Sequence, residues 1–235
     1  MKKFTLIIYL FSIFAVAQNH EITYTYKVEE FGAMEGVEKY IVDHFKNEVK
    51  KYNKMAEFLK LKTISNGETY STRFNKMMQS DEYTNTDLMS VKTLVSSVQP
   101  IYYDKGTSLA YNSAISSVVI EVINKDYVTW EIQNETKNIL GIQCYKATPQ
   151  NKNAKAKLVP EYVWFAPSLN FKASPSVFGN LPGAVLEAKK HNALITAVEI
   201  KETNKEPKRV EPKPGQKVMT YEGLSTQILQ TLGKN

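Results

Sequence analysis

The chain has 235 residues, of which 30 are basic, 24 are acidic and one, Cys144, is a cysteine. Only Arg73 and Arg209 among the basic residues are arginine, the side chain best suited to bidentate phosphate and base-edge recognition. The composition therefore argues against a nucleic-acid partner. A lone cysteine excludes an internal disulfide, and the length is sufficient for a sizeable core.

The first 17 residues have the pattern of a secretory signal peptide. Lys2 and Lys3 precede an apolar stretch at 4–14, and small residues at 15–17 fit a cleavage site after Ala17. The alternative, an N-terminal membrane anchor, needs about 20 apolar residues. We therefore expect an exported protein that starts at Gln18, has no integral membrane segment, and is periplasmic, outer-membrane-associated or extracellular.

The next two segments differ in their period. Residues 21–28 alternate between apolar and polar side chains, which predicts a β-strand. Residues 36–53 instead predict an amphipathic helix, because apolar residues recur at three- and four-residue steps: Val37, Ile41, Phe45, Val49 and Tyr52, with Met55 just beyond. The opposite face is rich in lysine. It is either a membrane-binding surface or the solvated face of a helix that packs on a sheet from behind, and the interspersed acidic residues favour the solvated face.

The chain after the helix is rich in strand signals up to about residue 203. Asn66-Gly67 predicts a hairpin turn between two short strands. Residues 75–93 show no clear period, which predicts a loop or flap. Short apolar runs follow, bounded by turn residues, at about 100–106, 117–123, 127–133, 138–148 and 162–169. Such spacing is typical of an antiparallel sheet or an open barrel rather than of a doubly wound α/β fold.

The expected fold is therefore α+β and mainly β. It consists of a curved antiparallel sheet or open half-barrel with one long N-terminal amphipathic helix. We expect a single domain at 18–203, with a polar surface loop at 149–160. Residues 204–235 form a tail rich in proline and lysine, with an exposed extension up to about 217 and a short terminal helix at 221–233.

A rigid corner is predicted at 178–183. Phe178 and Leu181 supply apolar anchors, Gly179 and Gly183 permit positive φ, and Pro182 fixes its own φ. The apolar runs on either side of a turn at 191–192 then predict a hairpin.

The corner at 178–183 lies in a stretch that resembles the signature of a known family. The stretch VFGNLPGAVLEAK at 177–189 resembles the signature of the GLPGLI family, an exported family of Bacteroidota. WEIQNETKNILGIQCYKAT at 130–148 and YVWFAPSLNF at 162–171 resemble further segments of that family in the same order. Asn180 replaces the first glycine of the motif, and Ala184-Val185 replaces its final Leu-Ile. The resemblance implies an exported protein and supplies no catalytic residue.

No catalytic, metal or cofactor motif is found, so we expect a protein that is not an enzyme and needs no cofactor. Cys144 lies in an alternating stretch, which favours a buried structural thiol over a nucleophile.

Aromatic residues are the positive signal for a binding site. The weak candidates are Trp130, Tyr162, Trp164 and Phe178, although ordinary sheet packing also favours such residues. Two functions stay open. One is a binding or assembly protein of the cell envelope that acts with a protein partner. The other is a carrier of a lipid or other apolar ligand in an open half-barrel.

Overall fold

The computed structural model describes residues 18–30, 36–77, 82–96, 98–112, 119–124, 128–150, 159–177 and 180–220, together with Gly223 and Thr226. The helices are α1 (Lys39–Met55) and α2 (Asn85–Val95). The strands are β1 (Asn19–Val28), β2 (Leu61–Ser65), β3 (Tyr70–Phe74), β4 (Val98–Asp104), β5 (Thr107–Asn112), β6 (Val119–Asn124), β7 (Trp130–Ile139), β8 (Ile142–Pro149), β9 (Tyr162–Ala166), β10 (Ala184–Lys190), β11 (Ala193–Thr203) and β12 (Val218–Thr220).

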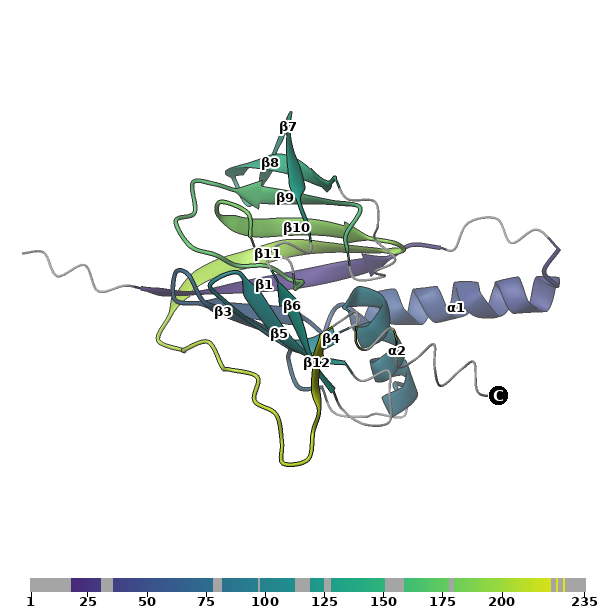
Figure 1. The fold of residues 1–235 in the computed structure, drawn as a ribbon. Helices are drawn as coiled ribbons and strands as arrows, with labels where there is room; N and C mark the ends of the chain where they lie inside the picture. The colour runs from purple at the N-terminus through teal and green to yellow at the C-terminus, as the bar shows by residue number, and fades with distance from the viewer. Residues whose placement is uncertain are drawn as a thin grey trace, which may run out of the picture.

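All these strands form one sheet in the order β12-β6-β5-β4-β3-β2-β1-β11-β10-β9-β8-β7. Neighbouring strands run antiparallel, except that β12 pairs in parallel with β6. Within the described residues β12 and β7 each have one neighbour, so the sheet is open. Its strands change direction between the tier of β8–β11 with β1 and the tier of β3–β6 (Figure 1). This confirms the prediction of a mainly β protein with an open antiparallel sheet.

Several local predictions are also confirmed. Gly67 has a φ of 108° in the turn between β2 and β3, and His191 has a φ of 45° in the turn between β10 and β11. The predicted signal peptide at 1–17, the corner residues Phe178 and Gly179, and most of the predicted helix at 221–233 lie outside the described residues.

The loop predicted at 75–93 is wrong, because its second half belongs to α2. Thr84 caps this helix: its hydroxyl accepts a hydrogen bond from the Asp87 backbone N–H, and the Asp87 carboxylate accepts one from the Thr84 N–H. The buried side of α2 holds Leu88, Val91 and Val95 at helical spacing. Polar residues around this short stripe conceal its period in the sequence.

The strands differ from the sequence analysis at three further places. The apolar run at 138–148 is interrupted by a turn at Leu140-Gly141, where both residues have positive φ, and it contributes to both β7 and β8. The prediction does not include β5, whose sequence TSLAYN has few large apolar residues. It also does not include β12, which is three residues long.

An irregular segment at 171–177 lies against one side of the sheet, and most of its residues are buried. Its carbonyl groups would be costly to bury without partners. Hydroxyl groups of β2, β3 and β5 donate to successive carbonyls of the segment: Ser65 to Lys172, Thr72 to Ser174, Tyr70 to Ser176, and Ser108 to Val177. This part of the chain therefore covers one side of β2, β3 and β5.

Residues 204–217, here called the strap, run from the end of β11, which lies inside the sheet, to β12 at one edge (Figure 1). Lys205 Nζ lies 2.7 Å from the buried Glu21 carboxylate, and the Lys208 N–H donates to Ser71 Oγ at 2.9 Å. Val210 is buried. The predicted exposed extension is therefore held to the sheet at several points.

Candidate functional site

The helix α1 contacts the body of the protein mainly through its C-terminal half. Val49, Tyr52 and Met55 are buried, whereas Phe45, on the same apolar stripe, is 39% exposed. The N-terminal half extends beyond the sheet (Figure 1). The stripe that the sequence predicts to pack on a sheet is therefore covered over only half of its length.

A groove of about 500 Å³ lies between this stripe and α2. Its apolar lining comes from both helices: Phe45, Val49, Tyr52, Met89 and Leu94. Met89 is 47% exposed. The polar lining includes His44, Glu48 and the hydroxyl groups of Thr86, Ser90 and Thr93. An apolar lining with a few polar groups at the rim is typical of a binding site for a side chain or an apolar molecule.

Lys51 links the two helices beside the groove. Its ammonium group lies 2.6 Å from Asp87 Oδ1 on α2 and 2.9 Å from Glu48 Oε1 on α1. The hydrogen bond from Lys51 lowers the pKa of Asp87, with further lowering from Thr84. Burial acts to raise the pKa of Glu48, but hydrogen bonds from Lys51 and Tyr52 outweigh it and the net shift is downward. The three groups fix the relative position of α1 and α2.

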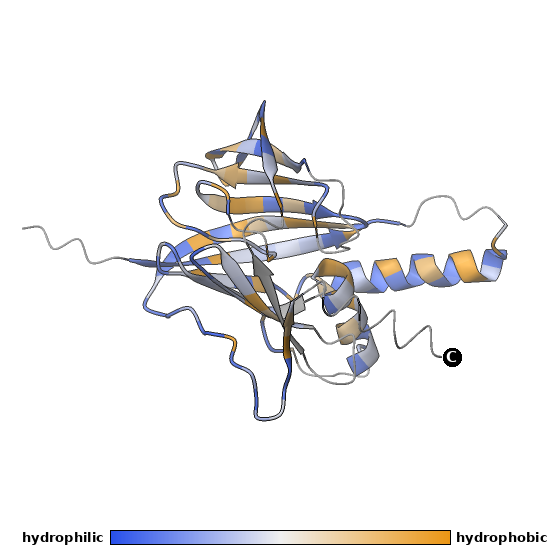
Figure 2. Cartoon of the chain, in the orientation of Figure 1, coloured by the Kyte–Doolittle hydropathy of each residue, from blue (hydrophilic) through white to orange (hydrophobic). Residues whose placement is uncertain are grey.

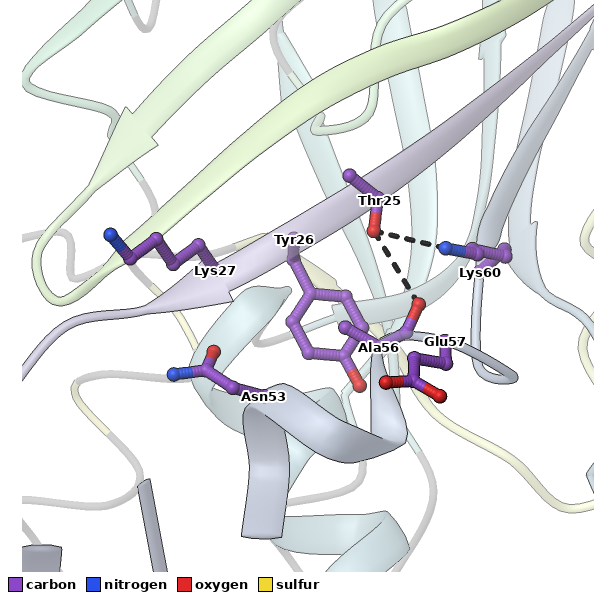
Figure 3. A pocket seen from close by; sticks show the side chains of 7 residues that line it. All are labelled: Thr25, Tyr26, Lys27, Asn53, Ala56, Glu57 and Lys60. Carbon is purple, nitrogen blue, oxygen red and sulfur yellow. Dashed lines mark hydrogen bonds between the residues drawn. The ribbon is translucent and has the colours of Figure 1, made fainter. Parts of the chain in front are cut away.

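A second pocket, of about 320 Å³, lies where the end of α1 meets β1 (Figure 3). Asn53 accepts a hydrogen bond from the Val28 N–H at 2.7 Å and donates to the Val28 carbonyl at 2.8 Å. Thr25 Oγ1 accepts from Lys60 and donates to the Ala56 carbonyl. These polar groups are used to attach α1 to the sheet. The pocket is therefore a crevice at the root of the helix whose Asn53, Thr25 and Lys60 are already hydrogen-bonded, and the groove is the stronger candidate site.

The aromatic residues proposed from the sequence do not form one platform. The Trp164 ring is buried, and Lys137 Nζ lies 5.0 Å from its centroid and 2.6 Å from Glu187 Oε1. Lys146 covers the neighbouring Tyr162 ring in the same way, at 5.5 Å. Trp130 packs in a different cluster. The rings of Tyr162 and Trp164 on β9 are therefore capped by lysine side chains.

The corner motif holds the end of the buried segment in place. Leu181 is buried, and its carbonyl accepts a hydrogen bond from Lys172 Nζ. Gly183 has a φ of 122°, and a Cβ atom built there would lie 2.2 Å from the Ala166 carbonyl oxygen. Asn180 accepts a hydrogen bond from Trp130 Nε1 at 2.9 Å. Leu181, Gly183 and Asn180 are therefore part of the packing between β9, β10 and β7, whereas Pro182 is exposed.

The described residues show few groups suited to catalysis. Cys144 is buried, and burial raises the pKa of its thiol. Among these residues, no three His, Cys, Asp or Glu side chains gather as a metal site would require. In the part of the chain that the structure describes, no helix is long and apolar enough to cross a bilayer.

Sequence reasoning did not identify the groove. It assigned the α1 stripe to sheet packing and placed Met89 in a loop. One signal was present, since Thr84 and Asp87 have the spacing of a capping box and mark the start of a helix. The position of α2 beside α1 depends on tertiary contacts that no local pattern contains.

Comparisons with known proteins identify one family. The family model described as N-glycanase peptide, N-terminal domain, matches residues 67–225, which is more than half of the chain. A solved structure of PNGF-II in space group P21 covers 92% of this chain at 16% identity, with a TM-score of 0.50. This chain spans 34% of that PNGF-II chain. The likeness shows a shared fold.

Two further solved structures are more distant. PNGF-II in space group C2 has a TM-score of 0.49 at 16% identity, covering 91% of this chain and 32% of that one. An uncharacterized conserved protein from Thermus thermophilus has a TM-score of 0.32 at 10% identity, covering 87% of this chain and 91% of that one. No curated protein matches the chain in sequence.

Proposed function

This chain belongs to the family of N-glycanase N-terminal domains, and we propose that it is a non-enzymatic binding or assembly protein of the bacterial cell envelope. The groove between α1 and α2 receives a segment of a partner protein. The observation that carries this proposal is the apolar stripe of α1, which continues from the buried Val49 to the exposed Phe45 along the groove. An apolar stripe left uncovered beside a groove is typical of a surface that receives another chain.

The family name does not establish an activity for this chain. N-glycanase is the activity named for the family, and this chain spans 34% of the PNGF-II chain. At 16% identity the likeness supports a fold and no residue role. Burial of the Cys144 thiol, which raises its pKa, argues against its use as a nucleophile.

Export is part of the proposal. The first 17 residues have the order of a signal peptide, and the corner around Pro182 resembles the GLPGLI signature of exported Bacteroidota proteins. We place the processed chain in the periplasm, at the outer membrane or outside the cell, with Gln18 as its first residue.

A second function is a carrier of a lipid or another apolar ligand. The volume and apolar lining of the groove favour it as the place for such a ligand. The segment at 171–177 covers one side of β2 and β3, so the ligand would lie between the helices rather than against these strands.

Site-specific photo-crosslinking in the producing cell tests the proposal. A photoreactive amino acid replaces Met89 in the groove or, as a matched control, the exposed Ile132 on β7, which is 53% exposed. We expect one discrete cross-linked protein from position 89, none from position 132, and loss of the product when Leu94→Asp is added. A lipid adduct at position 89 would favour the carrier. Equal products from both positions would contradict a specific site.

A further inference from the structure

Charged side chains of both signs line the crevice at the root of α1. They are Lys27 on β1, Glu57 just after α1 and Lys60 just before β2. Within the part of the chain that the structure describes, the ion pairs involve none of these three residues. Lys60 Nζ donates to Thr25 Oγ1 at 3.1 Å, which uses one of the three protons of its ammonium group. Two cations and one anion are therefore available to a ligand.

The hydroxyl group of Tyr26 is a second, independent sign of a binding site. Tyr26 lines the crevice and is 3% exposed, and its oxygen has no hydrogen-bond partner among the described residues. Burial raises the pKa of this phenol, so the hydroxyl stays protonated and is a donor that needs an acceptor. Figure 3 shows the hydroxyl directed toward Ala56 and Glu57. A buried donor of this kind is costly unless an acceptor reaches it.

The size and the apolar part of the lining fit a small molecule. Hydrophobic and hydrophilic residues alternate along α1 (Figure 2), and where its end meets β1 both kinds reach the crevice: Ala56 is buried, whereas Glu57 is exposed. The volume of about 320 Å³ lies at the lower end of the range of small-molecule sites, about 300–1,000 Å³. Ala56 and the Tyr26 ring offer a surface for a short carbon chain.

We propose that the crevice binds a free amino acid with an acidic side chain. Its two carboxylates lie beside the ammonium groups of Lys27 and Lys60, and its own ammonium group lies beside Glu57. On binding, the exposed side chain of Glu57 turns toward the ligand and uncovers the Tyr26 hydroxyl, which then donates to a carboxylate oxygen. Each charge of the lining meets one of opposite sign, in hydrogen bonds strengthened by that charge.

The crevice and the groove between α1 and α2 have no lining residue in common. The inference therefore goes beyond the proposed function and does not depend on it.

Isothermal titration calorimetry tests the inference with the processed chain that starts at Gln18. The probe is L-glutamate. L-lysine is a comparator that reverses the charge of the side chain, and N-acetyl-L-glutamate is one that keeps both carboxylates but lacks the free ammonium group. We expect saturable binding of L-glutamate, and binding weaker by about tenfold or more for each comparator.

Substitutions in the lining test the roles of its groups. Tyr26→Phe should weaken L-glutamate binding by about tenfold and leave the thermal melt unchanged or raise it, because it removes a buried donor without a partner. A hydroxyl with a purely structural role would lower the melt instead. Lys60→Gln and Glu57→Gln should each weaken binding by about tenfold. The matched controls Lys213→Gln and Glu131→Gln change exposed residues elsewhere and should bind as the wild type does.

Met89→Asp separates this site from the groove, since it should bind L-glutamate normally even if it loses the groove partner. Loss of L-glutamate binding in a folded Met89→Asp would place the ligand in the groove and overturn the inference. It is also overturned if neither L-glutamate nor L-aspartate binds at up to about 10 mM. Equal affinity for L-glutamate and either comparator, or unchanged affinity in both Tyr26→Phe and Lys60→Gln, would overturn it as well.

Discussion

Two constraints act on Gly183 at once, its φ of 122° and the Ala166 carbonyl oxygen 2.2 Å from any Cβ. A side chain can relieve neither without moving β10 away from β9. We expect Gly183→Ala to lower the free energy of unfolding by about 3 kcal/mol, from backbone strain together with overpacking. Urea denaturation followed by circular dichroism measures this loss.

Gly67→Ala is the matched control, because Gly67 also has positive φ, at 108°, but a Cβ there meets nothing within 4 Å. Its cost should be about 1 kcal/mol, from strain alone. Equal losses for the two variants would show that close approach to Ala166 adds nothing, and that the corner is not held as tightly as the distances indicate.

The Lys51–Asp87 pair predicts a loss of stability in acid. The folded pKa of Asp87 is lowered, mainly by the hydrogen bond from Lys51, so its stabilisation is fully present above the unfolded pKa of about 4. It is lost as the pH falls through the lower folded value. Asp87→Asn keeps a side-chain oxygen for the cap but removes the charge.

We therefore expect Asp87→Asn to be less stable than the wild type by about 1 kcal/mol near neutral pH. The difference should shrink at a second, acidic pH, as the pH falls through the lowered folded pKa of Asp87 and the wild-type carboxylate becomes protonated. Urea titrations of both proteins at the two pH values measure it. A difference that stays constant with pH would mean that the ion pair does not stabilise the contact between the helices.

At the level of elements, α1 is attached to the sheet near its C-terminal end. Asn53 makes two hydrogen bonds with the Val28 backbone, and the N-terminal half extends free of the sheet (Figure 1). Asn53→Ala should cost about 2 kcal/mol through these bonds and speed hydrogen exchange along α1. Asn47→Ala, on the exposed side of the same helix, should leave both unchanged. Identical exchange in the two variants would exclude this attachment.

The elements differ in how far local sequence predicts them. Alternating apolar residues identify β1, and Asn66-Gly67 locates the β2–β3 turn, because in each case the signal lies within a few adjacent residues. In α2 the buried stripe is short and its capping pair is the clearer sign, so the helix was missed. The groove depends on α1 and α2 meeting, which is a tertiary property. Sequence alone therefore identifies one wall of the groove, the α1 stripe with Phe45. It does not identify α2, the helix that forms the other wall.

At the scale of the whole molecule, long-range polar contacts stabilise the open sheet. The strap connects residues far apart in the chain, such as Lys208 with Ser71, and the segment at 171–177 satisfies its carbonyls with hydroxyls from strands distant in the sequence. Neither has a local pattern that indicates its partner. Together the strap and the segment at 171–177 cover parts of the sheet, and α1 extends from it. This arrangement suits a scaffold that presents a binding helix.

Native mass spectrometry of the protein, purified gently from its own cell envelope, tests the central claim most directly. The wild-type chain should carry one additional polypeptide in fixed stoichiometry, and Met89→Asp should lose it while keeping the same thermal melt. A stoichiometric mass of lipid size in place of the polypeptide would contradict the partner and support a carrier. A bare wild-type chain, or a partner retained by Met89→Asp, would contradict the assignment of the groove.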